Sequence, residues 1–168
     1  MTHVQITILQ VTMAVIVYAI IAKLYVWPRL QKMSVLDALI PLLLLHAFRY
    51  IGLMFLVPSV VGDDVPSAWA IPTAYADLAI SVLAILAVLA LHYRNAAGIP
   101  LAWLASLVGM ADFLQAYPRA ILGDITVGAA YYIPILFNPA MFVSYFMIYK
   151  LLISGTRKES SAPSAPRI

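Results

Sequence analysis

Five long apolar stretches, separated by short polar connections, dominate the hydrophobic pattern of this chain. A helix needs about 20 residues to cross a hydrocarbon core about 30 Å thick, and each stretch comes near that length. The pattern therefore predicts an all-α integral membrane protein, a bundle of five transmembrane helices. The predicted spans cover residues 4–26, 35–57, 73–93, 99–117 and 129–153.

The fourth predicted span is the shortest, and Asp112 and Gln115 interrupt its apolar run. A re-entrant segment in its place, with only four full spans, remains an alternative. Residues 1–153 are predicted to form one transmembrane domain. Residues 154–168, which are rich in Ser, Ala and Pro, are predicted to form a disordered cytoplasmic tail.

The composition supports a membrane protein, since 64% of the residues are hydrophobic and only 10% are charged. With so few charges, nucleic acid is not expected as a partner. The chain has no Cys, and its three His residues are too scattered for a zinc signature. We therefore expect no metal and no cofactor, and the lipid bilayer as the main partner.

The distribution of basic residues predicts how the helices are oriented, because basic loops face the cytoplasm. The first connection carries Lys23, Arg29 and Lys32, whereas the second carries Asp63 and Asp64 and no basic residue. This alternation predicts an outside N-terminus and a cytoplasmic C-terminus. The expected location is a bacterial inner (plasma) membrane.

Polar side chains within the apolar runs define the candidate site. A rise of 1.5 Å per residue puts Arg49 at about 20 Å above the cytoplasmic edge, Asp112 at about 17 Å and Asp77 at roughly 22–25 Å. Because an unpaired charge in lipid is costly, Arg49 is expected to pair with Asp77 or Asp112. The other residues predicted in this layer of the outer half are Gln10, His46, Gln115, Tyr132 and Asn138.

Two local features are expected to shape this layer. His46 lies level with Asp112, and a hydrogen bond between them would make a proton relay. In the fifth span, Pro134 and Pro139 remove backbone donors on either side of Asn138. A kink there is expected to free the carbonyl of Ile135 and point it at the layer.

We expect the layer to form a pocket that binds or moves a small polar or anionic solute, or relays protons. Arg49 would hold the negative group of the ligand, and Asp77 and Asp112 would neutralise Arg49 when the pocket is empty. His46 would shuttle a proton, and the amide side chains would orient the ligand. An opening on the outer side, capped by residues 58–72 with Trp69, is expected, and a transporter of this size would be a homo-oligomer.

Two other classes of function remain open. The charges could hold helices together in a structural or accessory subunit of a membrane complex, since polar contacts between membrane helices also fix packing. A small membrane enzyme could act on a lipid or quinone-like substrate through His46 and Asp112, although enzyme activity is not the favoured interpretation. An intramembrane aspartyl protease is disfavoured, because Asp77 and Asp112 are predicted to differ in height by a turn.

Overall fold

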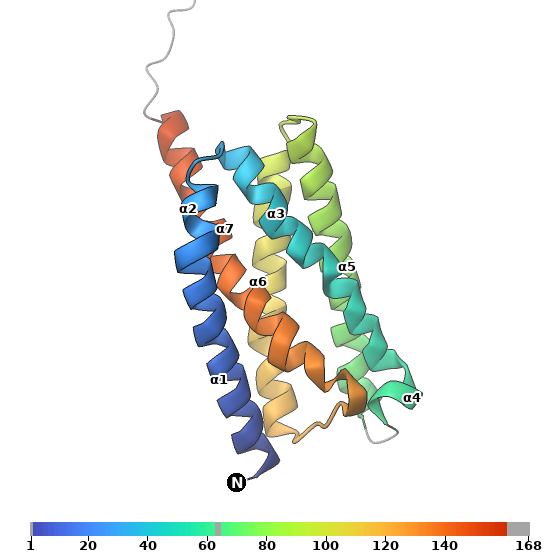
Figure 1. The fold of residues 1–168 in the computed structure, drawn as a ribbon. Helices are drawn as coiled ribbons and strands as arrows, with labels where there is room; N and C mark the ends of the chain where they lie inside the picture. The colour runs from blue at the N-terminus through green and yellow to red at the C-terminus, as the bar shows by residue number, and fades with distance from the viewer. Residues whose placement is uncertain (1, 63–64, 161–168) are drawn as a thin grey trace, which may run out of the picture.

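The protein is all-helical over the residues that its computed structural model describes, 2–62 and 65–160, with side chains to residue 155. Five helices are long and apolar enough to cross a membrane, as predicted, and they run side by side (Figure 1). They cover His3–Leu30, Val35–Leu56, Ser67–His92, Gly98–Leu122 and Gly128–Gly155.

Three of the spans change helix type along their length. The first joins α1 (His3–Ile21), a π-helical stretch (Ala22–Val26) and α2 (Trp27–Leu30). The second joins α3 (Val35–Ala47) to a 3₁₀ segment (Phe48–Leu56). The last joins a 3₁₀ stretch (Gly128–Tyr131), a π-helical stretch (Ile133–Phe137) and α7 (Asn138–Ser160).

Four of the five spans are longer than predicted, among them the fourth and the third. The fourth span, α6 (Gly98–Leu122), has full length, so the alternative of a short re-entrant segment is not found. The third, α5 (Ser67–His92), begins before Thr73 and contains Pro72. Its expected start followed the proline, whereas membrane helices tolerate prolines inside their length.

The second connection and the end of the last helix also differ from expectation. The segment expected to be a loop after the second span contains α4 (Pro58–Val61), which ends at Gly62 with a φ of 88°. Asp63 and Asp64 lie outside the described residues. α7 continues to Ser160, so residues 154–160 of the tail predicted to be disordered (154–168) are helical. The rest of that tail lies outside the described residues.

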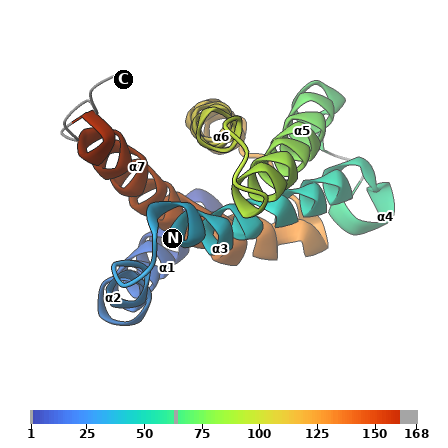
Figure 2. The same ribbon diagram turned by 90° about the horizontal axis from the view of Figure 1, so that it is seen from above.

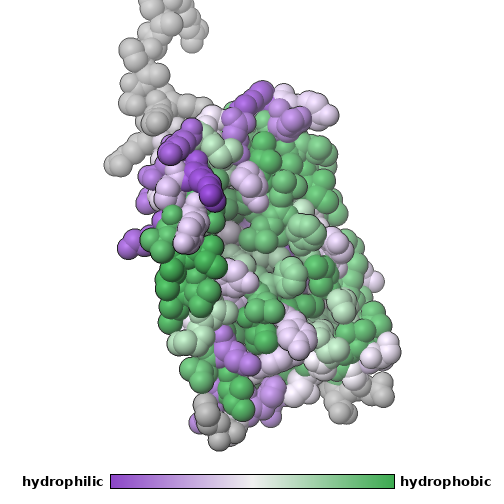
Figure 3. All heavy atoms as spheres, viewed as in Figure 1, coloured by the Kyte–Doolittle hydropathy of each residue, from purple (hydrophilic) through white to green (hydrophobic). Residues whose placement is uncertain are grey.

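α5 lies at the centre of the packing, between α3 and α6 (Figure 2). Small side chains allow α5 to approach α3 and α6 closely, and Ala74, Ala84 and Ala87 on α5 are fully buried. α1 lies at the edge against α7, and none of its residues is buried. Figure 3 shows the resulting apolar band on one face, with most polar side chains at its upper end and a smaller group near its lower end.

α6 and α7 approach each other where Gly109 faces Tyr145. A Cβ atom at residue 109 would lie only 2.8 Å from Cζ of Tyr145, so glycine leaves the space that this ring occupies. Tyr145 is among the largest fully buried side chains. The absence of a side chain at one position of α6 therefore allows a tyrosine of α7 into the core.

Gly109→Ala is expected to destabilise the protein, because the new methyl group would overlap Tyr145 and push α6 and α7 apart. Adding volume to a packed core costs about 1–3 kcal/mol. The melting temperature in detergent measures the change. Ala111→Val adds bulk to the exposed side of α6 and should have little effect, so an equal loss in both variants would contradict this explanation.

Candidate functional site

The candidate site begins where α3 changes to the 3₁₀ segment, one residue before Arg49. A 3₁₀ stretch within a longer helix is unusual and often marks a functional or strained place. The hydroxyl of Ser81 on α5 donates to the carbonyl of Ala47, directly at the change. Within the 3₁₀ segment, a Cβ at Gly52 would lie 2.7 Å from Cγ of Asp77, so this glycine lets α5 bring its carboxylate close.

Every guanidinium nitrogen of Arg49 has a protein partner. Nε donates to Oδ1 of Asp77 at 2.6 Å, and Nη2 lies 2.5 Å from the same oxygen. Nη2 also donates to Oδ2 of Asp112. Nη1 donates to the carbonyl of Gly109 at 3.3 Å and to the hydroxyl of Tyr145 at 3.2 Å. The fork of five N–H groups is thus fully used by α5, α6 and α7.

The cluster of Arg49, Asp77 and Asp112 carries more negative than positive charge when both carboxylates are ionised. All three residues are buried, with exposed fractions of 6%, 8% and 5%. Among the described residues, no hydrogen bond reaches Oδ2 of Asp77 or Oδ1 of Asp112. Each carboxylate therefore keeps one oxygen without a hydrogen-bond partner among the described residues, and that of Asp77 lies against Gly52.

The carboxylates of Asp77 and Asp112 both contact Nη2 of Arg49, so they lie at similar heights, which corrects the predicted difference of a turn. The estimate assumed uniform α-helices beginning at the predicted ends, whereas α5 begins six residues earlier than expected (67 against 73). Similar heights do not make a protease dyad. In such a dyad two carboxylates share a proton, whereas here both bind the same guanidinium.

His46 does not pair with Asp112, so the predicted relay between them is absent. Its Nε2 lies 2.8 Å from Oγ of Ser144 on α7, and its ring lies 4.1 Å from the ring of Tyr145 between centroids. Nδ1 has no hydrogen-bond partner among the residues that the structure describes. His46 is buried but faces α7. Its predicted pairing with Asp112 used only the height of the two residues, which does not fix the direction in which a side chain points.

Three residues predicted in the layer lie away from the cluster. Gln115 is exposed on α6, and Tyr132 is 65% exposed. Gln10 is exposed on α1, where its side chain accepts a hydrogen bond of 2.5 Å from the hydroxyl of Tyr131. The tyrosine that faces inward is thus Tyr131, one residue before the predicted one.

The start of the fifth span contains the predicted irregularity in a different form. A π-helical stretch covers Ile133–Phe137 and ends at Asn138, which is partly buried beside the cluster. The carbonyl that meets the neighbouring helix belongs to Pro134, and it accepts a hydrogen bond of 2.7 Å from the hydroxyl of Tyr117. The carbonyl that bonds across this interface is therefore that of Pro134, whereas the carbonyl of Ile135 was predicted to face the layer.

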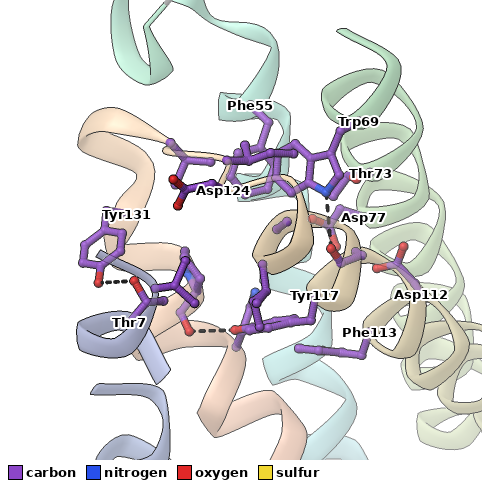
Figure 4. Close-up of a pocket in the computed structure, with 18 of the residues that line it drawn as sticks. Thr7, Phe55, Trp69, Thr73, Asp77, Asp112, Phe113, Tyr117, Asp124 and Tyr131 are labelled. Carbon is purple, nitrogen blue, oxygen red and sulfur yellow. Dashed lines mark hydrogen bonds between the residues drawn. The ribbon is translucent and has the colours of Figure 1, made fainter. Parts of the chain in front are cut away.

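A cavity of about 80 Å³, measured as space for the centres of water-sized molecules, leads from the cluster to the surface (Figure 4). Arg49, Asp77 and Asp112 lie at its inner end. At its outer end it is lined by His3 and Asp124, whose side chains are 46% and 73% exposed. This end of the bundle is the one at which α1 begins (Figure 1).

Aromatic rings form much of the cavity wall. The rings of Phe55 and Trp69 meet edge to face at 5.2 Å, and those of Phe113 and Tyr117 stack at 5.6 Å. Figure 4 shows the first pair above the second. Trp69 donates from Nε1 to the carbonyl of Ala116 at 3.3 Å, which fixes its ring against α6. Of these rings, only that of Trp69 was predicted from the sequence to lie at the site.

The described residues contain no group of three or more His, Asp or Glu side chains placed to hold a metal ion. Asp77 and Asp112 are the nearest to such a group, and Arg49 occupies the place between them. The chemistry that the site offers is therefore ionic and hydrogen-bonding, through carboxylate oxygens beside aromatic rings.

Arg49→Met is expected to lower the free energy of unfolding by about 3–5 kcal/mol, because it leaves two buried carboxylates without their cation. A triple variant that adds Asp77→Asn and Asp112→Asn removes this excess charge and should recover much of the loss. Unfolding in mixed micelles with increasing sodium dodecyl sulfate measures both.

Arg94→Met supplies the matched control for this comparison. It breaks an Arg–Asp pair with Asp37 whose side chains are 54% and 41% exposed, so it should change stability little. A triple variant as unstable as Arg49→Met would contradict the charge balance that we assign to the cluster.

A family model described as a domain of unknown function, DUF8737, matches residues 6–153 of the chain. The match includes all three residues of the charged cluster and nearly the whole five-helix bundle. No curated protein and no solved structure matches the chain.

Proposed function

We propose that this chain, which belongs to the DUF8737 family, is a multi-pass membrane protein whose cavity binds a small polar solute or a proton from the outer side. The observation that carries the proposal is the continuity of the cavity, which joins an exposed end of the bundle to a buried ionic cluster. Buried ionisable groups within membrane spans commonly belong to substrate or proton paths.

The role of Arg49 in this proposal differs from the one expected from the sequence. Its nitrogens are used by protein acceptors, so Arg49 holds the carboxylates in place and does not offer a free donor to an anion. The carboxylate oxygens of Asp77 and Asp112 are the groups that face an incoming ligand or proton. Asn138, which also lines the cavity, can orient a polar ligand.

The membrane orientation is part of the proposal, with the N-terminus outside and the C-terminus in the cytoplasm of a bacterial cell. In this orientation the cavity opens outward. The alternation of basic and acidic connections supports it, and the exposed apolar surface of α1 fits contact with lipid.

Single cysteines test the orientation, because the chain has no Cys of its own. Ser67→Cys, at the exposed start of α5, should react with a membrane-impermeant maleimide added to intact spheroplasts. Ala96→Cys, in the exposed turn after α5, should react only after the membrane is permeabilised. The opposite pattern, or reaction of both in intact spheroplasts, would contradict the orientation.

Filling the cavity tests the binding function. Ala116 lines the cavity on α6, so Ala116→Phe is expected to abolish binding, whereas Ala111→Phe on the exposed side of α6 should not. Trp69 reports occupancy by fluorescence once Trp27 and Trp103 are replaced by Phe. The probes are a pH step and three molecules of similar shape: choline, neutral 3,3-dimethylbutanol and anionic 3,3-dimethylbutyrate.

Two outcomes would contradict the binding function. One is the absence of any response of Trp69 to all four probes in the otherwise native protein. The other is an unchanged response in Ala116→Phe, measured on protein that remains folded and monodisperse in detergent.

A second candidate function is that of a structural or accessory subunit in a membrane complex. The observation in its favour is the complete use of Arg49 by protein acceptors, together with the unburied α1. Purification in mild detergent separates the two candidates, since an accessory subunit brings partners with it in fixed ratio. The solute-binding protein is recovered alone or as a homo-oligomer.

A further inference from the structure

We propose that the ligand of this cavity is a small organic cation, an ammonium group with an apolar body. The proposal rests on the proposed binding function and adds the class of ligand. It follows from three properties of the cavity: its charge, its hydrogen-bonding groups and its aromatic wall.

The charge of the cavity favours a cation. Two carboxylates and one guanidinium lie at its inner end, and the exposed Asp124 at its outer end adds a further negative charge. Apart from Arg49, the only basic side chain among the described residues that line the cavity is that of His3. Negative charge lining a cleft with low-dielectric walls raises the local concentration of cations.

The hydrogen-bonding groups point to the same class. The N–H and O–H groups of Arg49, Trp69 and Tyr117 all donate to protein acceptors, so an anion would find these strong donors already used. Acceptors are different, because one oxygen each of Asp77 and Asp112 has no hydrogen-bond partner among the described residues. A ligand that carries positive charge or donates hydrogen bonds can pair with these carboxylate oxygens.

The aromatic wall supplies the second half of the recognition. Cations bind over the faces of aromatic rings, Trp most strongly, and ammonium ligands are recognised in this way. The cavity already contains one such contact, since Cζ of Arg49 lies 4.9 Å from the ring centroid of Phe113. Phe55, Trp69 and Tyr117 extend this aromatic surface along the cavity.

The size of the cavity limits the ligand to a small one. A cavity of about 80 Å³ has room for several water molecules, since one water needs at least about 10–15 Å³. An ammonium group with a few carbon atoms matches this space. A large drug-like cation would require the helices to move apart.

Comparison of isosteres tests the class of ligand. Choline and 3,3-dimethylbutanol have nearly the same shape and differ in the charge at their branched centre, and 3,3-dimethylbutyrate carries a negative charge instead. Titrations followed by Trp69 fluorescence, with full-length protein in detergent, should show choline binding about tenfold or more tightly than the neutral isostere. The anion should bind most weakly.

Variants assign the preference to the cluster. Asp112→Asn should reduce the affinity for choline about tenfold or more and leave the affinity for 3,3-dimethylbutanol nearly unchanged. Asp37→Asn, which removes an exposed carboxylate outside the cavity, should change neither affinity. If Asp112→Asn fails to fold, the comparison of isosteres on the otherwise native protein still tests the proposal.

The outcomes separate this proposal from the one on which it rests. Equal binding of choline and its neutral isostere, or tightest binding of the anion, would overturn the cationic ligand and leave the binding cavity intact. Absence of binding by all three molecules would overturn the cationic ligand, and only the absence of a response to the pH step as well would overturn both.

Discussion

The charge-paired guanidinium of Arg49 is the interaction on which the rest of the bundle depends. An arginine in the middle of an apolar span is tolerated only where protein groups replace water around it. Here α5, α6 and α7 each supply acceptors, so one side chain of the second span ties three other spans together. Removing a hydrophobic contact would weaken one interface, whereas removing this cation affects the four spans that meet at it.

The same requirement explains the unusual backbone around the site. The guanidinium can reach both carboxylates only if the helices come close, and glycines provide the space. Gly52 leaves room for Asp77, and Gly109 leaves room for Tyr145 while its own carbonyl accepts from Arg49. The 3₁₀ segment that begins at Phe48 belongs to the same arrangement, since it sets the direction in which Arg49 leaves its helix.

The sequence predicts the charged cluster well and the rest of the polar layer poorly, for a physical reason. Arg49 has so large a cost when unpaired that its partners had to be among the few buried carboxylates, and both were found. Gln115 and Tyr132 carry no such constraint. Their predicted place used height along a helix, which says nothing about the side of the helix on which a residue lies.

Local changes of helix type add to this error. The 3₁₀ segment rises about 2.0 Å per residue and turns every three residues, and the π-helical stretch before Asn138 changes the rotation again. A uniform 3.6-residue period therefore loses track of direction beyond these segments.

The aromatic wall of the cavity is a part of the site that the sequence alone does not predict. Tyr117, Phe113 and Trp69 are common residue types in membrane spans, and their spacing alone does not separate a cavity wall from an interfacial belt. What distinguishes them is the charge that they enclose. A cluster with one cation and two carboxylates is a poor choice if its sole task is to hold helices together, because an apolar contact would do so without a residual charge. Because a cavity lies beside the cluster, a cation or a proton that enters it can neutralise that residual negative charge.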